Sequence, residues 1–192
     1  TQAESSAASD VYKRQDPHIT GPGEHEERLR AAVAAVEERV ASDNIELVFV
    51  LGDIAWSGGY DLAHAALSVP WVPVQGDNPI QVGEEDGFEL AFSDQLEAVS
   101  AAFPSWVRAP VPTYNPEHDA DSWLQNARMD HRGVRFVMLD WNSREVGTIF
   151  GETPDLHDFD GGTLPFLGDA LDTLPDGPDK RVVLLSHMAP FP

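Results

Sequence analysis

The sequence predicts an α/β fold, because hydrophobic strand segments alternate with helical segments along most of its length. Predicted strands at 45–51 and 71–75 flank a short predicted helix at 60–67, and this β–α–β order implies that the two strands pair in parallel. The first strand runs into Gly52-Asp53 and the second into Gly76-Asp77-Asn78. Open α/β sheets bind ligands where their strands end, so these polar residues are candidates for one site.

Two longer helices are predicted in the N-terminal half. Segment 26–40 places apolar residues at helical spacing and charged residues largely on the other side, and Gly21-Pro22-Gly23 precedes it as a helix breaker. An acidic loop at 83–87 leads into the second helix, at 88–103. One face of each helix is therefore expected to pack on a sheet.

The middle of the chain predicts an irregular crossing followed by a hairpin. Segment 104–121 holds four prolines and reads as an irregular surface segment. Segments 122–130 and 134–139 predict two strands, and His131-Arg132-Gly133 predicts the tight turn between them.

The C-terminal part predicts a long loop, a helix and a last strand. The loop at 144–162 is rich in Gly, Asp and His, and a loop of this length in a compact domain favours a functional role. The helix at 164–174 has Pro165 near its start, where proline is tolerated. The strand at 181–185 runs into Ser186-His187.

The first residues do not fit this pattern. Ser5 to Gln15 matches, in all eleven residues, the in-frame translation of a common transposase sequencing adapter. We therefore expect residues 1–15 to be an artefactual or disordered tail and residues 16–192 to be a partial domain, incomplete at both ends. A genuine flexible tail rich in Ser and Ala is the alternative.

Composition excludes several classes of function. The formal net charge is −21, and residues 1–15 hold two acidic and two basic residues, so it is the same without them. A surface this acidic disfavours nucleic acids as partners. The absence of cysteine excludes disulfides, thiolate metal sites and a cysteine nucleophile, and no segment is apolar enough to span a bilayer. The compartment and the oligomeric state stay open.

Four short motifs carry side chains of the kind that bind metals. They are Asp16-Pro17-His18, Gly52-Asp53, Gly76-Asp77-Asn78 and Ser186-His187. Carboxylates and imidazoles that converge at strand ends are the raw material of a two-metal hydrolytic site.

The order of these motifs resembles the calcineurin-like metallophosphoesterase family. Segments 48–59 and 134–141 are also similar to it, and the resemblance covers nearly all of residues 16–192. It implies a sandwich of two β-sheets flanked by helices, with two divalent ions, of which Mn, Fe or Zn suit the oxygen and nitrogen ligands.

The resemblance also implies a role for each candidate residue. Asp16 and His18 would hold the first ion, Asp53 would bridge both, and Asp77 and His187 would hold the second. A hydroxide between the ions would then attack the phosphorus of a phosphate-ester substrate.

Two departures from the family pattern affect the expected chemistry. Asp77 replaces the usual asparagine, which adds a negative charge. Asn78 replaces a histidine that contacts phosphate or protonates the leaving group, and an amide donates hydrogen bonds but does not titrate. The family's last motif, Gly-His-x-His, would lie beyond Pro192, so we expect incomplete metal loading and no activity for these residues alone.

The sequence therefore predicts metal-dependent hydrolysis of phosphate monoesters or diesters. One alternative is a degenerate member that binds metal or a phosphorylated ligand without turnover. The other is an acidic surface protein, in which Asp16, Asp53, Asp77 and His187 would lie far apart.

Overall fold

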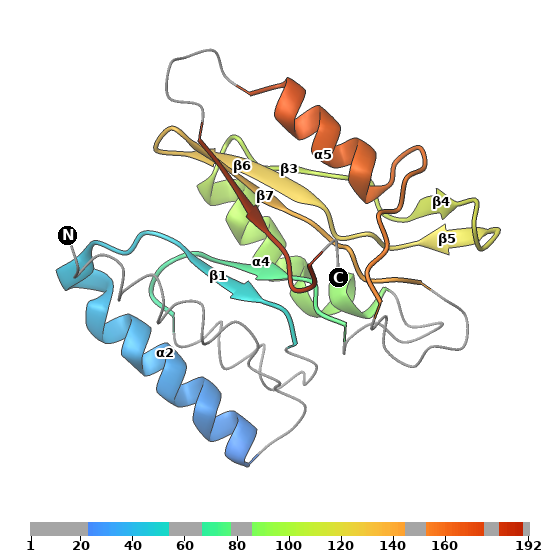
Figure 1. The fold of residues 1–192 in the computed structure, drawn as a ribbon. Helices are drawn as coiled ribbons and strands as arrows, with labels where there is room; N and C mark the ends of the chain where they lie inside the picture. The colour runs from blue at the N-terminus through green and yellow to red at the C-terminus, as the bar shows by residue number, and fades with distance from the viewer. Residues whose placement is uncertain (1–22, 54–66, 78–85, 145–152, 175–180, 190–192) are drawn as a thin grey trace.

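The computed structural model describes residues 23–53, 67–77, 86–144, 153–174 and 181–189. Within these ranges the chain forms a mixed α/β fold of three helices and three small sheets, and no sheet closes into a barrel (Figure 1). In chain order the elements are α2 (Glu24–Asp43), β1 (Val48–Leu51), β2 (Trp71–Val74), α4 (Gly87–Ala102), β3 (Val107–Arg108), β4 (Thr113–Asn115), β5 (Ala120–Ser122), β6 (Ala127–His131), β7 (Val134–Met138), α5 (Thr163–Asp172) and β8 (Arg181–Leu185).

The first helix, predicted at 26–40, is confirmed as the longer α2. Leu29 and Val33, one turn apart, are its buried residues. It ends at Asp43, and the next residue, Asn44, donates its N–H to the carbonyl of Val40. The left-handed backbone of Asn44 (φ 54°) turns the chain so that the N–H of Ile45 also bonds to this carbonyl, at 3.1 Å. Asparagine tolerates this conformation better than most residues, so the local sequence stops the helix there.

The parallel pairing predicted for the first two strands is confirmed. β1 and β2 run side by side in register from Val48↔Trp71 to Leu51↔Val74. Every residue of β2 is buried, and the ring of Trp71 meets Phe92 of α4 edge-on at 5.8 Å. Because the strands are parallel and in register, the residues after Leu51 and after Val74 emerge at the same edge of the sheet.

The second sheet has the order β3-β6-β7-β8. β6 and β7 form the predicted hairpin, whose two turn residues, Arg132 and Gly133, both have positive φ (49° and 77°), as the favoured two-residue hairpin turns require. β8 joins the edge of β7 in parallel, from Val134↔Arg181 to Met138↔Leu185. This pairing places the end of β8 beside the end of β7.

Two predictions for the middle of the chain are wrong. Segment 104–121 is not irregular throughout, because β3, β4 and the start of β5 lie in it. Segment 122–130 is not one strand, because β5 ends at Ser122 and β6 begins at Ala127. Between them, Gln125 donates its backbone N–H to Asp140 Oδ2, and Asn126 Oδ1 accepts the N–H of Asp140. Gln125 and Asn126 thus bond to Asp140 instead of pairing with a neighbouring strand.

The largest hydrophobic cluster among the described residues joins the β1–β2 sheet to the four-stranded sheet. Val72 and Val74 of β2 pack with Met129 and Met138 of the four-stranded sheet. On the same face, Phe49 of β1 stacks on Phe136 of β7, with ring centroids 5.2 Å apart. Burial of side chains of this size contributes about 1.5–3 kcal/mol each.

A separate cluster fixes α5 on the opposite face of the four-stranded sheet (Figure 1). Val137 and Leu139 pack there with Ala170 and with partly buried residues of α5. Arg135 of β7 reaches the end of the helix, where its Nη1 donates to the carbonyl of Ala170 at 2.7 Å. The two faces of this sheet are thus covered by different elements.

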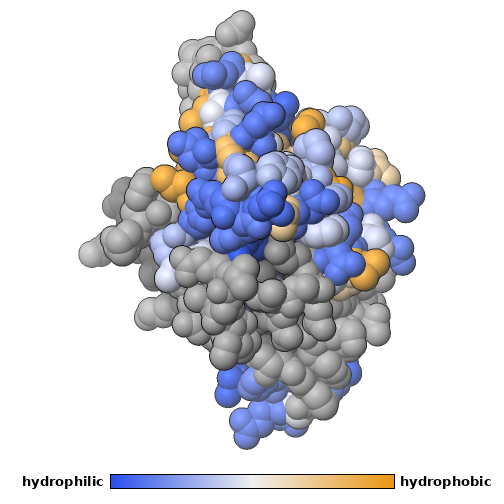
Figure 2. All heavy atoms as spheres, turned by 90° about the vertical axis from the view of Figure 1, so that its right-hand side faces the viewer, coloured by the Kyte–Doolittle hydropathy of each residue, from blue (hydrophilic) through white to orange (hydrophobic). Residues whose placement is uncertain are grey.

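One face of the described surface is mainly polar. Figure 2 shows one face on which hydrophilic residues predominate, with small, separate hydrophobic patches. No helix among the described residues has both the length and the apolar character needed to cross a bilayer. Residues 60–66 of the predicted short helix, 83–85 of the acidic loop and 145–152 of the long loop lie outside the described ranges.

Candidate metal centre

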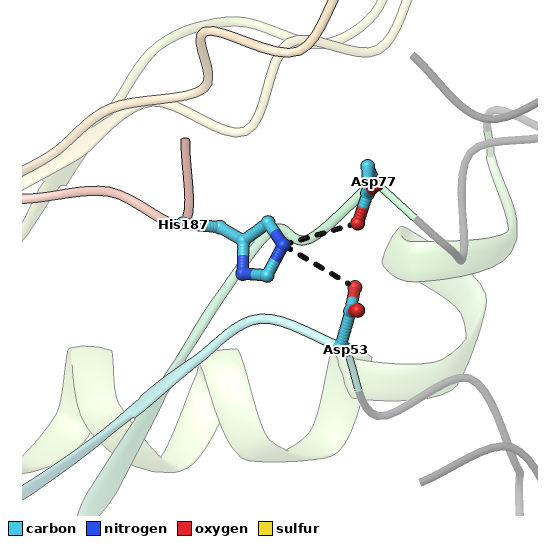
Figure 3. Close-up of side chains that lie close together, drawn as sticks. All are labelled: Asp53, Asp77 and His187. Carbon is cyan, nitrogen blue, oxygen red and sulfur yellow. Dashed lines mark hydrogen bonds and ion pairs between the residues drawn. The ribbon is translucent and has the colours of Figure 1, made fainter. Parts of the chain in front are cut away.

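Three side chains from three strand ends converge at one place (Figure 3). Asp53 follows β1, Asp77 follows β2 and His187 follows β8. Each offers one ligand atom, and these atoms all lie within 4.8 Å of one another. The parallel register of β1 and β2 places the two carboxylates together, and β8 brings the imidazole from the other sheet.

The imidazole of His187 is oriented by a backbone carbonyl. Its Nδ1 lies 3.1 Å from the carbonyl oxygen of Leu51, so Nδ1 carries the proton and donates it. The other nitrogen, Nε2, faces the carboxylates, 3.0 Å from Asp77 Oδ1 and 3.6 Å from Asp53 Oδ1 (Figure 3). With Nδ1 held in this way, Nε2 is the nitrogen that would bind a cation, as in metal-binding histidines.

The three side chains differ in exposure. The side chain of Asp53 is 0% exposed, that of His187 12% and that of Asp77 20%. Asp53 therefore lies at the bottom of the group, and Asp77 is the side chain that solvent reaches most easily.

The electrostatics of the group favour a cation. Burial raises the pKa of Asp77, and the hydrogen bond to Asp53 and its negative charge raise it further, while His187 partly opposes the change. The ligand atoms of Asp53 and Asp77 lie within 4.8 Å of each other, so the two carboxylates repel each other. A bound cation would relieve this repulsion.

Two glycines make room for this arrangement. A Cβ at position 76 would lie 2.3 Å from the backbone nitrogen of Asp53 and 2.4 Å from its Oδ1. A Cβ at position 52 would lie 2.3 Å from Nδ1 of His187, and Gly52 also has a φ of 83°. Any other residue at either position would collide with a site side chain or its backbone.

Asp53 itself has an uncommon backbone conformation. Its φ is 52°, in the left-handed region, which aspartate enters more readily than most residues. Strained backbone of this kind clusters at functional sites, where the surrounding structure holds it in place. Here the packing of Gly76 against Asp53 provides that support.

The donor set fits a divalent transition-metal ion. Two carboxylate oxygens and one imidazole nitrogen, without sulfur, suit Mn, Fe or Zn. The structure thus brings Asp53, Asp77 and His187 together, rather than apart as a purely solvated role would require. Asp16, His18 and Asn78 lie outside the described residues, so their predicted roles and that of a second ion stay predictions.

A buried polar network adjoins the end of β8 and was not foreseen in full. Asp140, just after β7, is fully buried and lies 2.7 Å from Nη2 of Arg144. Burial alone would raise the pKa of Asp140, but the charge of Arg144 and the hydrogen bonds from Arg144 and Gln125 outweigh it and hold this pKa below its usual value.

Asn142 and His157 extend this network. Asn142 donates its side-chain N–H to Asp140 Oδ1 at 2.8 Å, and Nε2 of His157 lies 2.9 Å from the carbonyl oxygen of Asn142. His157 is fully buried. No periodic pattern in the sequence signals this network, because the partners of Asp140 come from irregular segments.

The network adjoins the strand end that precedes His187. Leu139 donates its N–H to the carbonyl of Leu185 at 2.9 Å, which continues the β7–β8 pairing to the residue before Asp140. His187 lies two residues after Leu185. The network therefore supports the imidazole indirectly.

Comparisons of this chain with protein-family models, with curated proteins and with solved structures give no match.

Proposed function

We propose that this protein hydrolyses phosphate esters with two divalent metal ions, as the calcineurin-like metallophosphoesterases do. The observation that carries the proposal is the convergence of Asp53, Asp77 and His187 from three strand ends into one group of ligand atoms. A hydrolase of this type needs carboxylate and imidazole ligands fixed on rigid elements.

The fold supports the proposal at a coarser level. The proposed architecture is a sandwich of two sheets flanked by helices. The hydrophobic cluster between β1–β2 and the four-stranded sheet is consistent with it, as are the positions of α4 and α5. In such a sandwich the site lies at one end, where strands of both sheets stop.

Each residue has a distinct part in the proposed reaction. Asp53, with two carboxylate oxygens, would bridge the ions, while Asp77 and His187 would hold one ion and Asp16 and His18 the other. Bound ions would supply a nucleophile from water at neutral pH and offset the charge of the phosphate. Asn78 would orient the substrate by hydrogen bonds, because an amide does not transfer protons.

The test is metal-dependent turnover by the full-length gene product. Hydrolysis of p-nitrophenyl phosphate and of bis-p-nitrophenyl phosphate is measured with Mn²⁺, Fe²⁺ and Zn²⁺ in turn, and metal binding is measured by calorimetry. We expect turnover that requires metal, and a loss of at least about hundredfold in Asp53→Asn, because that change removes a buried charged ligand.

The exposed residue Asp94 of α4 provides the matched control. Asp94→Asn makes the same chemical change outside the site and should retain turnover. Metal binding without hydrolysis of either ester would favour the degenerate binding protein, for which the non-titrating Asn78 is the supporting observation. Absence of both metal binding and turnover would remove the proposal.

A further inference from the structure

The charge of the metal centre depends on Asp77. With a neutral imidazole on His187, the two carboxylates of Asp53 and Asp77 give the three described ligands a formal charge of −2. These residues alone would therefore offset half of the charge of the two divalent ions proposed above. Asp77 contributes one of these two negative charges, so it lowers the positive charge that an approaching ligand meets.

Asp77 is also the ligand that an arriving molecule would meet first. Its side chain is 20% exposed, compared with 12% for His187 and 0% for Asp53. Repulsion between this carboxylate and a second anion grows with the anion's charge and with proximity. The position of Asp77 on the accessible side of the group makes this repulsion count during binding.

Three arginines of the described residues are already neutralised by acidic partners. The pairs are Arg108 with Glu89, Arg135 with Asp130, and Arg144 with Asp140. Each arginine bonds to its own carboxylate at 2.5–2.7 Å, so its positive charge is already offset by that partner and does not offset the charge of Asp77.

We propose that Asp77 makes this site select phosphodiesters, with one negative charge, over phosphomonoesters, with about two at neutral pH. This inference rests on the proposed function, because it concerns the substrate of the same site. The negative charge of Asp77 repels a dianion more strongly than a monoanion, so it shifts binding and turnover towards the diester.

The same repulsion also favours release of product. Hydrolysis of a diester adds water across one P–O bond and gives an alcohol and a phosphomonoester. The phosphomonoester carries one more negative charge than the diester once its second proton has left. Asp77 therefore disfavours the product relative to the substrate.

The experiment compares a dianion and a monoanion on the Mn²⁺-saturated full-length protein. Inorganic phosphate and dimethyl phosphate are titrated by calorimetry at pH 8 into the native protein and into Asp77→Asn. The amide keeps an oxygen ligand and removes the charge. We expect the substitution to strengthen phosphate binding about tenfold more than dimethyl phosphate binding, and to weaken Mn²⁺ binding about tenfold or more.

Turnover gives a second measure of the same preference. The ratio of kcat/KM for bis-p-nitrophenyl phosphate to that for p-nitrophenyl phosphate should fall by a similar factor in Asp77→Asn and stay constant in Asp94→Asn. Asp77→Ser, also neutral, serves if the first variant does not fold, and it should change the ratio in the same direction.

The two ideas fail differently. Suppose that Mn²⁺ binds and supports turnover, but that the neutral variants keep the native ratio of phosphate to dimethyl phosphate affinity and the kcat/KM ratio of Asp94→Asn. The role of Asp77 in selection is then wrong, and the proposed hydrolase function stands. If the native protein shows neither Mn²⁺ binding nor turnover, the proposed function fails and this inference fails with it.

Discussion

Gly76 lies so close to Asp53 that its position has no room for even the methyl group of alanine. The space that a Cβ would fill is taken by the backbone nitrogen and Oδ1 of Asp53. Backbone atoms cannot move aside as the end of a flexible side chain can. Gly76 is therefore a steric requirement of the site, although it binds nothing itself.

We expect Gly76→Ala to displace Asp53 and to destabilise the protein by about 1–3 kcal/mol, the usual cost of overpacking. Metal affinity, measured by calorimetry with Mn²⁺, should fall with it because Asp53 loses its position.

Gly168→Ala is the matched control, because nothing lies within 4 Å of a Cβ at that position of α5. Alanine is the better helix former, so this change should stabilise the protein by up to about 1 kcal/mol and leave metal binding unaltered. Equal metal affinity in native protein and Gly76→Ala would contradict the steric argument.

At the scale of elements, the candidate site is a junction between two sheets. β1 and β2 carry the carboxylates, and β8, from the four-stranded sheet, carries the imidazole. A cation held by all three would add a direct bond between the sheets, in addition to their hydrophobic contact.

Metal binding should therefore stabilise the whole fold. At a Mn²⁺ concentration of about one hundred times its Kd, the free energy of unfolding should rise by about 2.7 kcal/mol. The shift, followed by thermal melting, should vanish in His187→Ala and persist in Asp94→Asn. It should be smaller at pH 5 than at pH 7.5, because the raised pKa of Asp77 makes a proton compete with the metal. An undiminished shift in His187→Ala would place the ion elsewhere.

The strand ends were predictable because each follows a continuous hydrophobic run. Asp53 and Asp77 follow two parallel strands in register, which end at the same edge of one sheet. His187 also follows a hydrophobic run, but its strand belongs to the other sheet, so the register alone does not place it beside them. The buried Asp140 network could not be predicted, because Arg144 and His157 lie in the segment predicted as a long loop, which has no periodicity.

The boundaries of β6 escaped prediction for the same reason. Gln125 and Asn126 lie in a sequence that is compatible with a strand, and their contacts with Asp140 take them out of the ladder. Long-range polar contacts leave no periodic signal in a single sequence.

At the scale of the whole molecule, charge controls stability in two opposite ways. The formal charge of −21 makes the folded chain repel itself at neutral pH, and acidification towards the sequence pI of about 4.4 relieves this. Further acidification removes ion pairs. The hydrogen bond from Arg135 is the main cause of the lowered pKa of Asp130. The hydrogen bond from Arg108 is likewise the main cause of the lowered pKa of Glu89.

The sign of the acid effect follows from these lowered pKa values. A carboxyl whose folded pKa lies below its unfolded value, about 3.9 for aspartate, stabilises the fold fully above that value. The contribution is lost as the pH falls through the folded pKa. We expect stability to decline below about pH 4, and the decline to be shallower in Asp130→Asn and Asp140→Asn. Urea unfolding between pH 2 and pH 5 measures the slopes, and identical slopes in all three proteins would contradict the assignment.

The ring of His187 occupies the space that a side chain at position 52 would need, and it bonds to Leu51, 136 residues earlier in the chain. A nascent polypeptide therefore cannot finish the site until residue 187 has left the ribosome. Metal binding at this proposed site would then require that the chain has been synthesised as far as residue 187.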